Sequence, residues 1–196
     1  MSKLRRIFVD VETTGISKII SRVVELAYIV YLGDEEKRRY SELVEPYGFT
    51  IPQDAIDVHG ITNEKATEEG LPITEVMIDF NRAARQADLI IAHNAEFDIK
   101  VIANEMSRID NFPPIALNVT PVYCTMKNLT HYCELDRYDR YGNKMQGYKW
   151  PTLWELYRKV FGEEIHQTHR ALEDLEYLSE CYFELLDEGV IEGRGE

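Results

Sequence analysis

The order of strand-type and helix-type segments constrains the fold of this chain more than any other feature. Residues 5–11, 22–32 and 37–45 are rich in β-branched and aromatic side chains, and only short polar breaks separate them. This pattern predicts three strands joined by short turns, so that the sheet begins as a meander. Residues 73–87 then place apolar side chains at steps of three and four, which predicts an amphipathic helix.

The middle of the chain alternates between the two kinds of segment. The apolar run at 88–93 predicts a buried strand, and Asn94 suits the N-cap of a helix over 95–108. A weaker strand pattern follows at 121–126. We therefore expect an α/β fold with a mixed five-stranded sheet flanked by helices.

Two further helices are predicted near the end of the chain. Thr152 and Glu155 have the spacing of a capping box, which predicts a helix over 152–161 that ends at Gly162. The apolar spacing over 170–188 predicts a final amphipathic helix. In sheets of this kind, functional sites gather at the carboxyl ends of the strands.

Length and composition predict a single intracellular domain. With 196 residues, 44% of them hydrophobic, we expect one domain over 1–190 and a short C-terminal tail over 191–196. No apolar stretch approaches the roughly 20 residues of a membrane span, and the basic start lacks a signal-type segment. The cysteines are odd in number and form no C-x-x-C pair, which favours a reducing, cytoplasmic location without membrane contact. They are Cys124, Cys133 and Cys181.

The acidic balance limits how nucleic acid could be bound. The 35 acids outnumber the 22 lysines and arginines, and a net charge of −13 excludes a general phosphate-binding surface. The segment 127–149 is the local exception, because its five basic residues exceed its three acids and tyrosines are frequent around it. It is either a solvated tyrosine-rich loop or an arm that contacts a polynucleotide by charge and stacking.

Two acids end the first predicted strand. Asp10 and Glu12 are two residues apart, so they point to one face of the strand while Val9 and Val11 point to the other. Two carboxylates this close repel each other unless a cation lies between them. Oxygen ligands alone suit Mg²⁺ or Mn²⁺. The pair by itself is a weak indication, since most such pairs bind no metal.

Two later stretches add acids and a histidine. Asp98 falls in the first turn of the helix after the buried strand, where it could simply offset the helix dipole. Asp174 lies on the last helix, and His169 stands at or before its first turn. A histidine there could also be a cap or a surface residue. A zinc pair of His166 with His169 is conceivable, but no further ligand supports it.

Together these stretches resemble one family in order and spacing. "FVDVETTG" (8–15), "HNAEFD" (93–98) and "HRALED" (169–174) resemble the DEDDh 3′-to-5′ exonuclease superfamily, of the DnaQ-like proofreading type. "VHGIT" (58–62) and the "VVELA" stretch around Glu25 match secondary family segments. The resemblance covers nearly the whole chain and implies a ribonuclease H-like fold.

The resemblance also implies roles for individual residues. Two Mg²⁺ (or Mn²⁺) ions would be held by Asp10, Glu12, Asp98 and Asp174, and His169 would act as general base. The terminal nucleotide would meet the backbone of Thr13, Thr14 and Gly15 and the side chains of His59, Asn94 and Phe97. Structural alternatives stay open: a strand-ending turn for 13–15, a core aromatic for Phe97 and a helix cap for Asn94. Glu25 would support the site from the neighbouring strand or be an ordinary edge acid.

The implied function is removal of nucleoside 5′-monophosphates from the 3′ end of DNA, with single-stranded or frayed ends preferred and DNA favoured over RNA. Alternatives are an RNA-trimming exoribonuclease of the same family and a non-catalytic subunit that binds nucleic acid or a polymerase. Contact with a polymerase or with a second copy is possible in each case. Residues 134–150 would clamp substrate, contact a partner chain or cover Trp150 and Trp154, with turns at 142–143 and Gly147.

Overall fold

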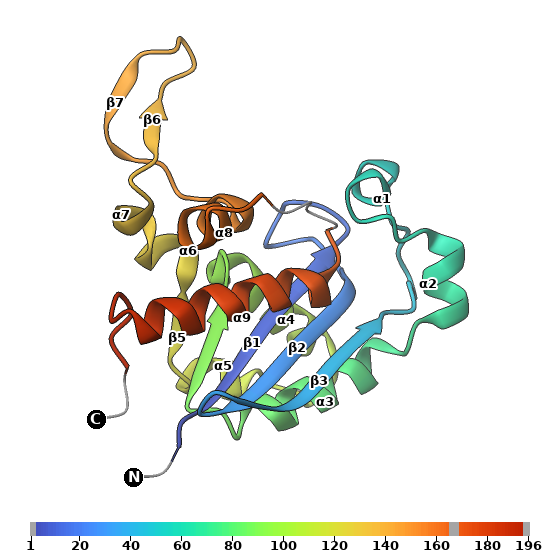
Figure 1. Ribbon diagram of the computed structural model, residues 1–196. Helices are drawn as coiled ribbons and strands as arrows, with labels where there is room; N and C mark the ends of the chain where they lie inside the picture. Colours follow the sequence, from blue (N-terminus) through green and yellow to red (C-terminus); the bar gives the residue numbers. More distant parts are fainter. Residues whose placement is uncertain (1–2, 165–168, 194–196) are drawn as a thin grey trace.

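The computed structural model describes residues 3–164 and 169–193, and its centre is a five-stranded sheet (Figure 1). The strands are β1 (Arg5–Thr13), β2 (Val23–Leu32), β3 (Glu35–Leu43), β4 (Leu89–Ala92) and β5 (Val122–Cys124). They lie in the order β3-β2-β1-β4-β5, with the first three antiparallel and β4 and β5 added in parallel. The predicted mixed five-stranded sheet is therefore confirmed.

Helices cover both faces of this sheet. They are α1 (Gln53–His59), α2 (Asn63–Glu69), α3 (Ile73–Ala84), α4 (Ala95–Arg108), α5 (Ile115–Val119), α6 (Thr125–Asn128), α7 (Thr130–Cys133), α8 (Leu153–Phe161) and α9 (Ala171–Asp187). Helices α3, α4 and α5 pack on one face, and α8 and α9 pack on the other. Within the described ranges, no helix is long and apolar enough to cross a membrane.

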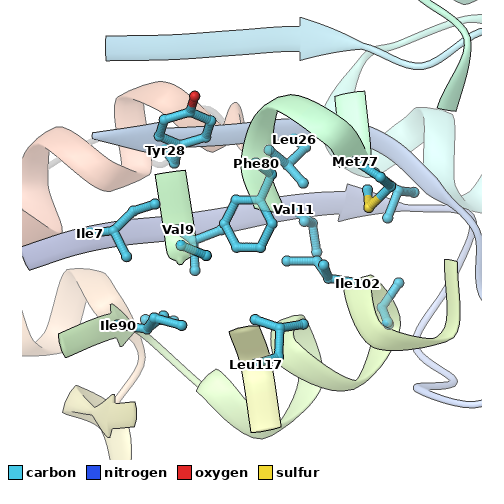
Figure 2. Close-up of a cluster of buried hydrophobic side chains, with 14 of the residues drawn as sticks. Ile7, Val9, Val11, Leu26, Tyr28, Met77, Phe80, Ile90, Ile102 and Leu117 are labelled. Atoms are coloured by element: carbon cyan, nitrogen blue, oxygen red, sulfur yellow. The ribbon is translucent and has the colours of Figure 1, made fainter. Parts of the chain in front are cut away.

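The side chains of β1 alternate between two cores. One core lies between the sheet and α3, α4 and α5 (Figure 2), and β1 contributes Ile7, Val9 and Val11 to it. On the opposite face, Phe8 is fully buried and packs edge-on against Tyr182 of α9, with ring centroids 5.4 Å apart. Burial of a side chain of this size contributes roughly 1.5–3 kcal/mol, so both faces of β1 are anchored.

This anchoring fixes where the strand's acids point. Asp10 and Glu12 follow Phe8 at steps of two and therefore share the α9 face, as predicted. A slip of one residue would turn both carboxyl groups into the apolar core around α3 and α4. In the β1–β2 ladder Glu12 stands directly opposite Glu25, and the register shifts immediately after it.

Several predicted boundaries differ from the observed ones, and three of the differences have a clear local reason. The third strand starts at residue 35, because Gly33, with φ 69°, and Asp34 make the turn alone. The fifth strand stops at Cys124, because the Thr125 hydroxyl bonds back to the Ala92 carbonyl at 3.3 Å and the chain turns into α6. Helix α3 ends at Ala84, where the last turn tightens into i→i+3 bonds.

The predicted ends of α8 are confirmed, and Asn94 differs in detail. The capping box of Thr152 and Glu155 is complete, and Gly162 closes the helix with φ 74°. Asn94 does precede α4, but it has φ 65° and its side chain makes no capping hydrogen bond. Asn is among the few non-glycine residues that adopt the left-handed region readily, so the residue type suits this backbone although its side chain does not cap the helix.

A small hairpin projects from the rest of the fold beyond α7 and α8 (Figure 1). It consists of β6 (Asp136–Tyr138) and β7 (Lys144–Tyr148), and nearly all of its side chains are exposed. The predicted turn at 142–143 is present, and Asp139 organises it by accepting hydrogen bonds from the backbone N–H groups of Tyr141 and Asn143 at 2.8 and 3.0 Å.

Candidate active site

Three acids that are distant in the sequence meet at the carboxyl end of β1. Asp10 and Glu12 come from the strand, and Asp174 comes from the first turn of α9, which crosses this face of the sheet (Figure 1). One carboxylate oxygen from each of the three lies within 4.8 Å of the others. The packing of α9 on Phe8 thus brings together two of the predicted stretches.

Asp98 approaches the same acids from α4. It is 3% exposed and lies outside the three-residue group. Its negative charge nevertheless contributes to raising the pKa values of both Asp10 and Glu12. The backbone of Val11, between those two acids, hydrogen-bonds to Asp98 and partly offsets the effect of burial on it. All four predicted acids therefore act on one another electrostatically.

The charge balance of this cluster is unfavourable as it stands. Burial raises the pKa of Asp10 well above its ordinary value, and the charges of Asp98, Glu12 and Asp174 add to the effect. Burial and Asp174 raise the pKa of Glu12 to about 8, although Arg170 opposes them, and burial raises that of Asp98 to about 8. Full ionisation near neutral pH thus requires a cation. Clustered carboxylate oxygens are the donors that Mg²⁺ or Mn²⁺ prefers, so the residues fit the implied metal.

Glu25 is a buried acid of a different kind. It is 1% exposed and accepts hydrogen bonds from Arg170 Nη2 at 2.9 Å and Nε at 3.1 Å. The backbone N–H of Ala171 and the Ser41 hydroxyl complete its partners at 3.3 and 2.9 Å. Glu25 therefore fastens the beginning of α9 to β2. The bound residue Ala171 lies two residues after His169 and three residues before Asp174.

His169 stands at the entrance to α9 in a strained backbone conformation. Its φ is 49°, in the left-handed region that β-carbon-bearing residues rarely adopt. Strain of this kind persists only where the surrounding structure imposes it, and it concentrates at functional sites. Burial lowers the pKa of the His59 imidazole, and His169 adds to the effect. His166, the other half of the conceivable zinc pair, lies outside the described residues.

A cavity of about 560 Å³ opens beside the acids. Five of the six predicted substrate contacts line it, namely Thr13, Gly15, His59, Asn94 and Phe97. Thr14 is the sixth and does not line the cavity. Its hydroxyl accepts a hydrogen bond from the Arg22 N–H at 2.9 Å, and its own N–H donates to the Arg22 carbonyl at 3.0 Å.

The cavity wall next to β1 is a turn that is held by side-chain hydrogen bonds. The Thr13 and Ser21 hydroxyls both donate to the Gly15 carbonyl, at 2.6 and 2.8 Å. His59 faces this turn from α1, and its Nδ1 accepts a hydrogen bond from the Ile61 N–H at 3.0 Å. Burial lowers the pKa of His59, so its imidazole is neutral near pH 7 and carries its proton on Nε2.

Sequence reasoning missed several lining residues of this cavity. Val11 lines it from β1 beside the predicted Glu12, Ile16 lines it from the following loop, and Asp54, Ala55 and Val58 line it from α1. The α1 residues and His59 have the spacing of one helix face, so the periodicity of 54–59 after Pro52 was the signal for them. Ile16 carried no comparable signal, because it stands in a loop and is 98% exposed.

The sequence that builds this site matches a known protein family. The family model described as "Exonuclease" matches residues 7–182 of the chain. The chain belongs to this exonuclease family. The match includes all four acids and His169.

Relatives of this exonuclease chain include parts of replication enzymes. It is 30% identical over 183 residues to the DNA polymerase III subunit epsilon of Aquifex aeolicus, covering 93% of the chain and 80% of that protein. It is 33% identical over 101 residues to the PolC-type DNA polymerase III of Oceanobacillus iheyensis, covering 52% of the chain but only 7% of that protein.

The fold also matches solved structures. E. coli exonuclease I, in complex with a dT13 oligonucleotide, superposes with a TM-score of 0.77 at 18% identity. The alignment covers 94% of the chain and 41% of exonuclease I. At this identity the likeness establishes the ribonuclease H-like arrangement of sheet and helices.

Proposed function

We propose that this protein is a metal-dependent 3′-to-5′ exonuclease that releases nucleoside 5′-monophosphates from the 3′ end of DNA, with single-stranded or frayed ends preferred. The observation that carries the proposal is the meeting of Asp10, Glu12 and Asp174 within 4.8 Å beside a nucleotide-sized cavity. Kinship with a polymerase epsilon subunit and the oligonucleotide seen on exonuclease I support DNA as the substrate.

Four carboxylates would hold two Mg²⁺ or Mn²⁺ ions, namely Asp10, Glu12, Asp98 and Asp174. When bound, such ions supply positive charge to the scissile phosphate and acidify water. The raised pKa values of Asp10, Glu12 and Asp98 follow from uncompensated negative charge, and they mark where this positive charge is required.

His169 would serve as general base. A ring nitrogen takes the proton of the attacking water, since imidazole titrates close to the working pH. The hydroxide attacks the phosphorus of the terminal phosphodiester, and the bond from this phosphorus to the 3′ oxygen of the preceding nucleotide breaks. That oxygen takes up a proton and becomes the new 3′ hydroxyl of the shortened strand, while the nucleoside 5′-monophosphate leaves. Arg170 is fixed by Glu25, so the adjacent His169 is held at the start of α9 near the acids.

The terminal nucleotide would occupy the cavity. Its volume of about 560 Å³ lies in the usual range for small-molecule sites. Thr13 and Gly15 present backbone at one wall, while Phe97 and His59 offer ring surfaces for the base and sugar, with Asn94 nearby. Thr14 contributes through the turn that it closes with Arg22.

The decisive experiment follows digestion of matched DNA and RNA oligonucleotides labelled at the 5′ end. We expect DNA to shorten stepwise from its 3′ end in Mg²⁺ and to stay intact in EDTA. Faster shortening of RNA would favour the exoribonuclease alternative. Binding without cleavage of either strand would instead favour the non-catalytic subunit, and the proposal would be wrong.

His169→Ala tests the proton-transfer role. A general base contributes typically 10²- to 10⁴-fold, so we expect kcat to fall by about that factor while oligonucleotide affinity changes little. An unchanged kcat would remove His169 from the mechanism and leave the acids as the only catalytic groups.

A further inference from the structure

Trp150 is an exposed aromatic side chain that the mechanism above does not use. It is 60% exposed, although tryptophan is mostly buried in folded proteins. The ammonium group of Lys127 lies 5.7 Å from the centroid of its ring. A large ring kept in water next to a cation offers both a stacking surface and a phosphate-attracting charge.

Trp150 is fastened to the segment that lines the cavity. The next residue, Pro151, is bound through its carbonyl to His93 Nε2 at 2.9 Å. His93 Nδ1 in turn contacts the Thr125 hydroxyl at 3.0 Å. His93 immediately precedes Asn94, which lines the cavity. The backbone next to Trp150 is therefore tied, through the His93 side chain, to the segment that lines the cavity.

Lys127 is tied to the same segment through a second contact. Its ammonium donates to Glu96 Oε2 at 2.8 Å, and Lys18 binds the other oxygen of Glu96. Glu96 immediately precedes Phe97, which lines the cavity. Two lysines thus share one carboxylate, so this surface group carries a net positive charge in a chain whose overall charge is −13.

We propose that Trp150 and Lys127 form a stacking platform for a nucleobase upstream of the 3′ terminus in a single strand whose end occupies the cavity. The inference rests on the proposed function and extends it to the path of the strand. Strand β7 ends at Tyr148, two residues before Trp150, and the hairpin β6–β7 projects from the rest of the fold (Figure 1). At its tip the Arg140 guanidinium lies 4.7 Å from the centroid of the Tyr141 ring.

Binding of oligothymidylate of about 12 nucleotides tests the platform without relying on cleavage. The affinity is measured in the Asp10→Asn background with and without Trp150→Ala. Stacking of one base on an aromatic ring predicts that Kd rises about 5- to 100-fold in Trp150→Ala and much less in Trp150→Phe. Lys127→Gln should raise Kd less and reduce its salt dependence.

Tyr47→Ala is the matched control. Tyr47 is an exposed aromatic side chain, 86% exposed, that lies near Arg108 and Asp110 and away from the platform. Its removal should leave Kd unchanged. A second readout uses the only other tryptophan, Trp154: in a Trp154→Phe background the emission reports Trp150 alone, and a stacked base should quench it.

The outcomes separate the platform from the proposed function. A Kd that is the same in Trp150→Ala as in the parent, or emission that oligothymidylate does not quench, would overturn the platform, including the case in which this surface docks a protein. Wild-type protein that binds but does not cleave would overturn the exonuclease function and leave the platform supported. In an active enzyme, Trp150→Ala should also lower the ratio of kcat/KM for the long strand to that for a dinucleotide.

Discussion

Two sets of acidic residues in this protein differ in what balances their negative charge. Glu25 and Glu105 are each 1% exposed, and each is bound by arginine: Glu25 by Arg170, and Glu105 by Arg22 at 2.6 Å. Asp10, Glu12 and Asp98 instead gather with Asp174, and their pKa values rise. The sequence gives all of these residues the same chemistry, so their surroundings decide what they do.

The acids bound by arginine stabilise the fold, whereas the clustered acids are suited to catalysis. An acid that binds arginine fastens two elements together, as Glu25 joins β2 to α9. An acid that faces other acids lowers the stability of the protein until a cation arrives, so its presence is explained by function. Glu12 and Glu25 face each other across the β1–β2 ladder, which places the two kinds of acid side by side.

Asp10→Asn should show the largest effect and separates the two sets most clearly. Loss of one ligand removes several kcal/mol of charge stabilisation, so we expect exonuclease activity to fall about 10³-fold or more. The free energy of unfolding without metal should not fall, because one repelling charge is gone. Asp34→Asn, in the exposed β2–β3 turn, is the control for both measurements. Wild-type activity in Asp10→Asn would contradict the metal site.

Mg²⁺ should stabilise the protein more at pH 8 than at pH 5. The folded-state pKa values of Glu12 and Asp98, about 8, lie above their unfolded values, so these groups favour the fold below about pH 4 and lose that contribution as the pH rises through 8. Mg²⁺ at a hundred times its Kd adds about 2.7 kcal/mol. At pH 5 it must displace protons and should add less. Equal shifts in Tm at both pH values would contradict the charge balance described for the cluster.

His93 provides an internal check on the sign of this pH dependence. Burial lowers its pKa to about 4, so the neutral imidazole favours the fold above about pH 6.5 and that contribution is lost as the pH falls toward 4. Its effect therefore runs opposite to that of the acid cluster. Because His93 is not a metal ligand in the proposal, the Mg²⁺-dependent difference in Tm isolates the acids.

Glu25→Gln should destabilise the protein, in contrast to Asp10→Asn, because Glu25 is bound by arginine. Breaking a buried ion pair costs about 3–5 kcal/mol, and because the Arg170 side chain is 36% exposed we expect about 2 kcal/mol. Chemical denaturation measures this loss. Adding Arg170→Met to Glu25→Leu should recover part of it, since the unpaired charge is then gone. A Glu25→Gln protein as stable as Asp10→Asn would erase the distinction between the two sets.

Much of the fold could be predicted because its determinants are local. The alternation of β1, the capping box at Thr152 and the periodicity of α9 are each read from a few neighbouring residues, and each is confirmed. Helices α6 and α7, four residues each, were not predicted because such short segments carry no periodic signal. The 3.3 Å bond that ends β5 at Cys124 joins residues 33 apart, so the weak strand pattern could not reveal it.

The candidate site divides in the same way. The spacing of Asp10 and Glu12 predicts that they share a face, and the family resemblance added Asp174 to them. The packing of α9 across β1 is what brings Asp174 next to the pair in the structure. The left-handed backbone of Asn94 and His169 could not be predicted from the sequence, because Asn and His adopt this conformation more often than most residues but still only in a minority of cases. Glu25 matched a family segment, yet its bond to Arg170 depends on two elements 145 residues apart.

Substitutions of the exposed charged residues in the hairpin β6–β7 should have the smallest effect on stability. These charges, unlike those of the two sets of acids, are exposed to water. Lys144 pairs with Asp136 at 2.6 Å, and both side chains are largely exposed, so such a pair contributes little. Replacing Arg137, Arg140 and Lys144 with glutamine should change the free energy of unfolding by less than about 0.5 kcal/mol. The same change should weaken single-strand binding and reduce the slope of log K against log salt by about 0.7 for each lost phosphate contact. An unchanged slope would show that the exposed charges of the hairpin contribute neither to folding nor to binding of the strand.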